Sequence, residues 1–177
     1  MRLLNHVEGI TEETFTNEIL APHLIGAGYE SVSARLIGNA RLRSHRGGTR
    51  AWVDVKKDIV RHLQSDQGAV ATTMVDYYAL PASGPKEWPG RADANKKQFA
   101  QKARTVQTEL LKDVVADMGR NFDPKRFVPF VVMYEFEDCY SAIVMLLREQ
   151  WVRKTLLQIY KKYVTNSTPQ RRLMTRR

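Results

Sequence analysis

The sequence has a single cysteine and no long apolar run, and each absence excludes a class of protein. Cys139 cannot form a disulfide within the chain, and this sparse cysteine usage fits a reducing cytoplasm. No apolar run approaches the roughly 20 residues that a membrane-spanning helix needs. No signal-peptide pattern opens the chain either. We therefore expect a cytoplasmic protein without a membrane segment.

The body of the chain also has little net charge. Residues 1–137 contain 19 Lys and Arg against 17 Asp and Glu, which gives +2 of the total +9. Residues 138–177 contain 9 against 2 and carry the remaining +7. An argument from net charge to nucleic acid therefore applies to the C-terminal tail alone.

Hydrophobic periodicity predicts alternating strands and helices in a chain of single-domain length, 177 residues. The alternation favours an α/β fold with a mostly parallel sheet of about four strands flanked by helices, and we expect this domain to occupy residues 1–137. A basic helical tail would follow over residues 138–177, with its helix near 140–163. The strands are expected at 3–7, 31–36, 70–75 and 127–133, and the helices at 15–24, 51–66 and 99–114.

The first strand leads into a tight turn and then a helix. Gly9 supplies a permissive backbone for the turn, and Thr11 has the side chain of a helix N-cap. Glu8 falls where the strand ends, so its carboxylate should point into the crevice in which open α/β sheets bind ligands.

Three of the predicted strands end in acidic residues. Glu8 follows the first strand, Asp76 the third, and Glu135 and Glu137 the fourth. Parallel strands bring their carboxyl ends to one edge of a sheet, so these side chains should converge. Clustered carboxylates favour a divalent cation, and hard oxygen ligands select Mg²⁺ or Mn²⁺. The four histidines are scattered and form no competing ligand set.

A basic, glycine-containing loop separates the second strand from the second helix. Arg46, Gly47, Gly48 and Arg50 in this loop could bind a phosphate through guanidinium groups and backbone amides. A solvated surface loop is the alternative. The later segment 77–91 is too rich in Pro and Gly to be regular, but Tyr77, Tyr78 and Trp88 indicate that it is ordered.

Six short motifs, in the right order over residues 1–137, resemble the domain-of-unknown-function family 4276. That family is similar to Toprim-like domains, which bind Mg²⁺ and act on phosphodiesters. The motifs are Val7-Glu8-Gly9-Ile10-Thr11-Glu12-Glu13, Ala21-Pro22-His23-Leu24, Arg46-Gly47-Gly48, Val75-Asp76-Tyr77-Tyr78-Ala79-Leu80-Pro81, Trp88-Pro89-Gly90-Arg91 and Glu135-Phe136-Glu137.

The resemblance maps Glu8 onto the Toprim glutamate and Asp76 onto the first aspartate of an Asp-x-Asp pair. The second aspartate position is Tyr78 here, so Glu135 or Glu137 would have to supply the missing carboxylate. The resemblance implies a Mg²⁺-dependent, nuclease-like enzyme in which Glu8 is a general acid/base or a metal ligand. Related Toprim-like proteins accompany ATPases in bacterial anti-phage defence, which implies nucleic acid and an ATPase as partners. A non-catalytic interaction subunit is the alternative function. The substrate and the oligomeric state are not indicated by the sequence.

The tail departs from the pattern of the resembling family. Its members continue the Glu-Phe-Glu motif with Gly/Ala-Leu-Leu-Phe-Ser-Asp, whereas Asp138-Cys139-Tyr140-Ser141 follows here. Permitted codons for residues 138–177, read one base earlier, can restore that continuation without a stop. We therefore hypothesise that the tail is out of frame, and an inactive product of a frameshifted gene is a third alternative for the function. The alternative is a genuine basic amphipathic helix. An open frame encoding this tail in close relatives would rule out the frameshift.

Overall fold

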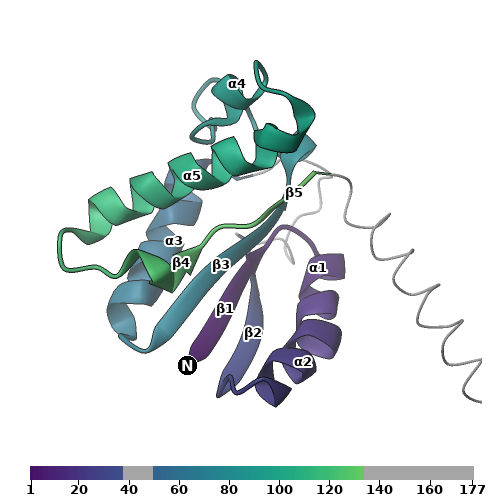
Figure 1. Ribbon diagram of the computed structural model, residues 1–177, viewed down its shortest axis with the longest axis vertical. Helices are drawn as coiled ribbons and strands as arrows, with labels where there is room; N and C mark the ends of the chain where they lie inside the picture. Colours follow the sequence, from purple (N-terminus) through teal and green to yellow (C-terminus); the bar gives the residue numbers. More distant parts are fainter. Residues whose placement is uncertain (38–49, 134–177) are drawn as a thin grey trace, which may run out of the picture. The chain divides into compact units, whose positions relative to one another are not determined.

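The computed structural model of the chain describes residues 1–37 and 50–133 (Figure 1). The tail helix expected near 140–163 and the domain boundary expected after residue 137 lie outside these residues, as does the proposed change of reading frame.

The described part of the chain forms an α/β fold around a parallel sheet, as the sequence predicted. The strands lie in the order β2-β1-β3-β4, and a short β5 also pairs with β3. Every pairing is parallel. The strands are β1 (Arg2–Val7), β2 (Ser31–Leu36), β3 (Ala69–Asp76), β4 (Phe127–Val128) and β5 (Val131–Val132).

Helices cover both faces of this sheet (Figure 1). The connection from β1 to β2 carries its helices on one face, and the connections from β2 to β3 and from β3 to β4 place theirs on the other. Right-handed crossovers require this, because the chain reverses its direction across the sheet after β2. The first face has α1 (Ile10–Phe15), a π-helical turn η1 (Thr16–Leu20) and α2 (Ala21–Gly26); the second has α3 (Trp52–Ser65), α4 (Arg91–Ala94) and α5 (Phe99–Met118), with the 3₁₀ turns η3 (Tyr77–Ala79) and η4 (Pro124–Arg126) in the connections.

The helix after β1 begins earlier than the sequence suggested. Gly9, and not Thr11, is the N-cap of α1, and its N–H donates to Glu12 Oε2 at 3.1 Å. Glu12 is buried, and a Cβ on residue 9 would lie 2.8 Å from that oxygen. The prediction was wrong because the capping carboxylate reaches back from the first turn, so no cap side chain is needed.

The fourth strand is not continuous. The run expected at 127–133 forms β4 and β5 with Pro129 between them, and proline has no N–H to donate to a sheet. Threonine side chains of β3 replace the lost bonds. Thr73 Oγ1 donates to Phe130 O and accepts from Phe130 N, both at 3.0 Å, and Thr72 Oγ1 donates to Val128 O at 2.6 Å.

The larger core lies between the sheet, α3 and α5, and it includes the loop after β3. Trp88 is fully buried, its ring lies 4.9 Å from that of Trp52, and its Nε1 donates to Arg50 O at 3.0 Å. Tyr77 is buried as well, whereas Tyr78 is 61% exposed. The segment 77–91 is therefore ordered, as its aromatic content predicted, although one of the three aromatic residues lies at the surface.

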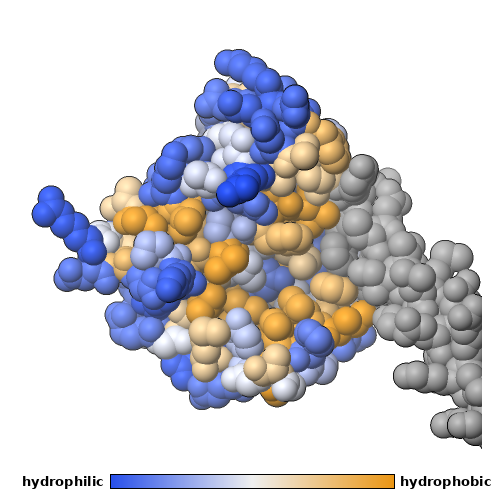
Figure 2. All heavy atoms as spheres, viewed as in Figure 1, coloured by the Kyte–Doolittle hydropathy of each residue, from blue (hydrophilic) through white to orange (hydrophobic). Residues whose placement is uncertain are grey.

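Apolar side chains also reach the surface of the described domain. Figure 2 shows them gathered over the strands, between α5 and α1. Val128 and Phe130 of the β4–β5 edge are exposed. The proline between the two short strands removes a donor from this edge, which limits its pairing with another chain.

Gly90 starts α4 with a left-handed backbone, and we expect Gly90→Ala to be the more damaging of two matched glycine changes. Its φ is +76°, and an added Cβ would lie 3.0 Å from Thr105 O and 2.9 Å from Glu109 Cγ. Gly84 has a similar φ of +81° with nothing within 4 Å of an added Cβ. Gly84→Ala should lower the free energy of unfolding by about 1 kcal/mol. Gly90→Ala should lower it by about 2–3 kcal/mol, because overpacking adds to the backbone strain.

Urea denaturation of both variants beside the unsubstituted protein measures this difference. Equal losses of stability would mean that α5 moves away from residue 90 without resistance.

Candidate functional site

Glu8 and Asp76 lie at the carboxyl ends of two adjacent parallel strands. Glu8 directly follows β1, and Asp76 is the last residue of β3. The register pairs Val7 with Met74, so the two acids are one residue out of step across strands about 4.8 Å apart. Because side chains alternate along a strand, this step directs the two side chains to opposite faces of the sheet. Both acids nevertheless lie at the same edge, because the two strands are parallel.

This edge is the place where a doubly wound sheet forms its ligand crevice. From β1 the chain crosses to β2 on one side, whereas β3 lies on the other side of β1. Open α/β sheets bind their ligands at such a switch point, outside the carboxyl ends of the strands. Glu8 and Asp76 therefore stand at the two ends that bound this crevice.

The two carboxylates suit a hard divalent cation. Both residues are half-buried, and one oxygen of each, Glu8 Oε2 and Asp76 Oδ1, is screened from solvent. Residues 1–37 and 50–133 contain no cluster of three or more acidic, histidine or cysteine side chains that could hold a metal. Mg²⁺ commonly keeps several waters and binds through one or two carboxylates plus substrate phosphates. A two-carboxylate site therefore fits Mg²⁺ or Mn²⁺ and fits zinc poorly.

The other predicted site residues fall outside the described residues, with one exception. Glu135, Glu137, Arg46, Gly47 and Gly48 belong to segments 38–49 and 134–177. The chain enters those two segments after β2 and after β5, at the same edge of the sheet as Glu8 and Asp76. Their roles as metal ligands and phosphate-binding residues stay predictions.

Arg50 is the exception, and its guanidinium faces acidic residues of α3. Arg50 Nη1 lies 3.0 Å from Asp58 Oδ2, and Nε lies 3.7 Å from Asp54 Oδ2. A phosphate would have to compete with these carboxylates for it. Phosphate binding by Arg50 stays a prediction, and its contacts here stabilise the start of α3.

Arg91 is a buried cation beside the site that the sequence analysis did not single out. Its Nε donates to Tyr77 O and its Nη1 to Tyr77 Oη, both at 3.0 Å, and Nη1 also donates to Asn95 Oδ1. The guanidinium carbon lies 3.9 Å from the centre of the Tyr77 ring, where a cation–π contact is favourable. All these partners are neutral, and Tyr77 directly follows Asp76. The motif Trp88-Pro89-Gly90-Arg91 was the available signal, but only the fold brings it to Tyr77.

Comparison with protein families gives one match, to the family described as a domain of unknown function (DUF4276), over residues 7–171. This match runs past residue 137 into the tail, which the frameshift hypothesis did not lead us to expect. No curated protein and no solved structure matches the chain. In the part of the chain that the structure describes, no helix combines the length and the apolar character needed to cross a membrane.

Proposed function

The chain belongs to the DUF4276 family, and from this premise we propose that it is a Mg²⁺- or Mn²⁺-dependent, nuclease-like enzyme that hydrolyses phosphodiester bonds. The observation that carries the proposal is the position of Glu8 and Asp76 at the ends of the two strands that bound the switch point of the sheet. Hard carboxylate oxygens at a ligand crevice suit a cation that also binds phosphate. The Toprim-like resemblance supports the same chemistry, and a cytoplasmic location fits it.

Asp76 would hold the cation together with Glu135 or Glu137, and Glu8 would act either as the general acid/base or as a further ligand. When bound, the ion supplies charge stabilisation to the oxygens around phosphorus. In hydrolysis a water oxygen bonds to phosphorus and the bond to the leaving sugar oxygen breaks. As general base, Glu8 accepts the proton of that water, and the leaving sugar oxygen takes a proton from solvent water.

A second function, a non-catalytic subunit that binds a protein partner such as an ATPase of an anti-phage system, is favoured by one observation. Tyr78 stands where the second acid of an Asp-x-Asp pair would be, and it is 61% exposed. It meets the Tyr77 ring edge-on at 5.2 Å, so the position is filled by an aromatic pair and not by a ligand. An exposed aromatic residue of this kind suits a protein contact.

Metal binding distinguishes the metal-dependent enzyme from the non-catalytic subunit. If the chain is the enzyme, we expect divalent cations to stabilise the unsubstituted protein. A ligand that binds only the native state at 100 times its Kd adds about 2.7 kcal/mol to the free energy of unfolding. Thermal denaturation with and without Mg²⁺ or Mn²⁺ measures this as a higher Tm. Asp76→Asn should abolish the increase, because the amide keeps the shape and loses the charge.

Glu18→Gln is the matched control, since Glu18 lies exposed on η1, away from the carboxyl edge. A Tm that rises equally in the Asp76→Asn variant would locate the cation elsewhere. No rise in any of the three proteins would favour the non-catalytic function.

A further inference from the structure

The first half of α5 and the residues just before it are strongly basic. Residues 95–108 contain four cationic side chains and no acidic one: Lys96, Lys97, Lys102 and Arg104. The acids of α5 come later and are already in ion pairs. Glu109 lies 2.6 Å from Lys112, and Asp113 and Asp117 lie 3.1 and 3.0 Å from Lys56. Positive charge is therefore concentrated at one end of the helix.

This basic end lies beside the candidate site. The start of α5 lies near the carboxyl ends of β3 and β5 in Figure 1. Lys102 Nζ is 5.9 Å from the centre of the Tyr77 ring, the same ring that carries Arg91 at 3.9 Å. Tyr77 directly follows Asp76 in the chain, so Arg91 and Lys102 approach the residue next in sequence to a proposed metal ligand.

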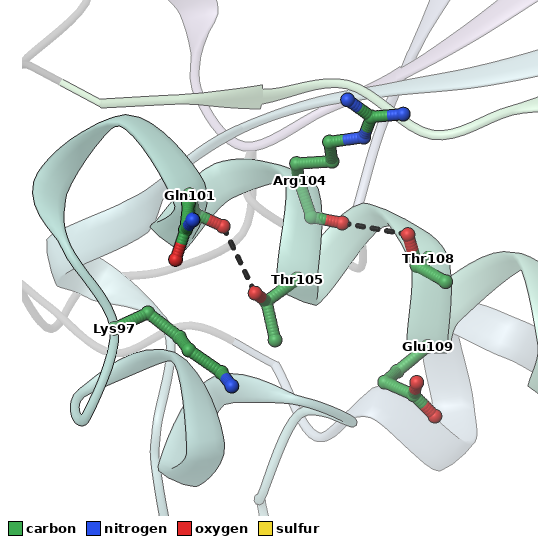
Figure 3. A pocket seen from close by; sticks show the side chains of 6 residues that line it. All are labelled: Lys97, Gln101, Arg104, Thr105, Thr108 and Glu109. Carbon is green, nitrogen blue, oxygen red and sulfur yellow. Dashed lines mark hydrogen bonds between the residues drawn. The ribbon is translucent and has the colours of Figure 1, made fainter.

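An open groove runs along the same stretch of α5. It has a volume of about 400 Å³, and the residues that line it all carry polar or charged groups (Figure 3): Lys97, Gln101, Arg104, Thr105, Thr108 and Glu109. Thr105 and Thr108 donate to the helix backbone, at Gln101 O and Arg104 O, and Glu109 is paired with Lys112. Lys97 and Arg104 form no ion pair with any described residue, so their charges are available to an anion.

We propose that this surface, the groove lined by Lys97 and Arg104, binds the sugar–phosphate backbone of a polynucleotide and leads it to Glu8 and Asp76. The inference rests on the proposed function and adds that the substrate is a polymer and not a mononucleotide. Lys97 lies just before α5 and Arg104 within it, and both line the same groove, so they can contact neighbouring phosphates of one strand. The groove has no aromatic side chain on which a base could stack, so contacts to the backbone are the ones it favours.

The test is binding of a labelled single-stranded oligonucleotide to the full chain, followed by fluorescence anisotropy in EDTA over a range of salt concentrations. The double variant Lys97→Gln/Arg104→Gln should lower the slope of log K against log salt by about 1.4, since each phosphate contact contributes about 0.7. If the two salt curves meet at 1 M, that slope makes binding about 25-fold weaker at 0.1 M. Both side chains are exposed, so the fold should survive their replacement.

The matched control is Arg120→Gln/Lys125→Gln, which removes the same charge from exposed positions beyond the other end of α5 and before β4. We expect it to bind like the unsubstituted protein. Equal weakening in the two double variants would show that net charge, including that of the basic tail, explains binding, and would overturn the proposal. Equal competition by a mononucleotide at matched phosphate concentration would also overturn it, as would binding to anionic vesicles without binding to the oligonucleotide.

Because EDTA prevents cleavage, the binding result is independent of catalysis. Cleavage without selective loss of binding in Lys97→Gln/Arg104→Gln would leave the proposed function standing and remove the polynucleotide surface. Selective loss of binding by that variant, in a protein that never cleaves, would support the polynucleotide surface and remove the proposed function.

Discussion

Glu8→Gln is expected to lower Mg²⁺-dependent cleavage of an oligonucleotide by about 10²–10⁴-fold, the usual contribution of a general acid/base. The amide keeps the size of the side chain at the end of β1 but removes its charge and its ability to take a proton. The fold should be unaffected, because α1 is capped by Gly9 and Glu12 and not by Glu8. Single-turnover cleavage of a labelled substrate by the full chain measures the loss.

Two further variants make the result specific. Asp76→Asn should also lose cleavage, through loss of the metal, whereas Glu18→Gln should keep the full rate. Raising the Mn²⁺ concentration should recover part of the activity of Asp76→Asn if only metal affinity was lost. Undiminished cleavage by Glu8→Gln would mean that the activity resides elsewhere or comes from a contaminant.

Strong local patterns predicted most of the fold. The β-branched run before Asp76 gave β3, and the apolar positions Trp52, Val55, Ile59 and Leu63 gave α3, because burial of one face decides both structures. The errors arose where a single residue overrode the pattern. Pro129 divides an apolar run that otherwise has the composition of one strand, and the bridging hydroxyls come from β3, more than fifty residues away.

The candidate site was predictable only where strand ends define it. Glu8 and Asp76 follow from topology, since adjacent parallel strands end at a common edge. Arg50 was assigned to phosphate because the loop is basic, but the first turns of α3 present Asp54 and Asp58 to it. Arg91 was passed over because its burial depends on the Tyr77 ring, a contact that sequence spacing alone does not reveal.

The buried His6 is expected to make the protein lose stability in mild acid. His6 lies on β1 beneath α3 and is 1% exposed. Its Nδ1 is 3.3 Å from Thr72 O, so Nδ1 carries the proton of the neutral ring, and Nε2 is buried with no hydrogen-bond partner among the described residues. Burial lowers the pKa of His6 from 6.5 to about 4, and the nearby His62 and Arg35 act in the same direction.

The sign follows from which state binds the proton. Between pH 6.5 and 4 the unfolded chain holds a proton on this imidazole and the folded chain does not, so the free energy of unfolding falls as the pH falls through that window. The stability is complete above pH 6.5. A difference of about 2.5 pH units corresponds to a loss of about 3 kcal/mol at the acid end. His62, whose pKa is also lowered by burial, adds to the loss with the same sign.

Urea denaturation at pH 7 and at pH 4.5 measures this effect, and His6→Asn isolates the part due to His6. The asparagine amide can still donate to Thr72 O, but it does not titrate, so the variant should be less stable at pH 7 and should lose much less stability on acidification. His23→Asn is the matched control, because it makes the same replacement at an exposed position on α2. If His6→Asn loses as much stability between pH 7 and pH 4.5 as the unsubstituted protein, the acid sensitivity belongs to another group, and the imidazole of His6 is protonated in the folded state without penalty.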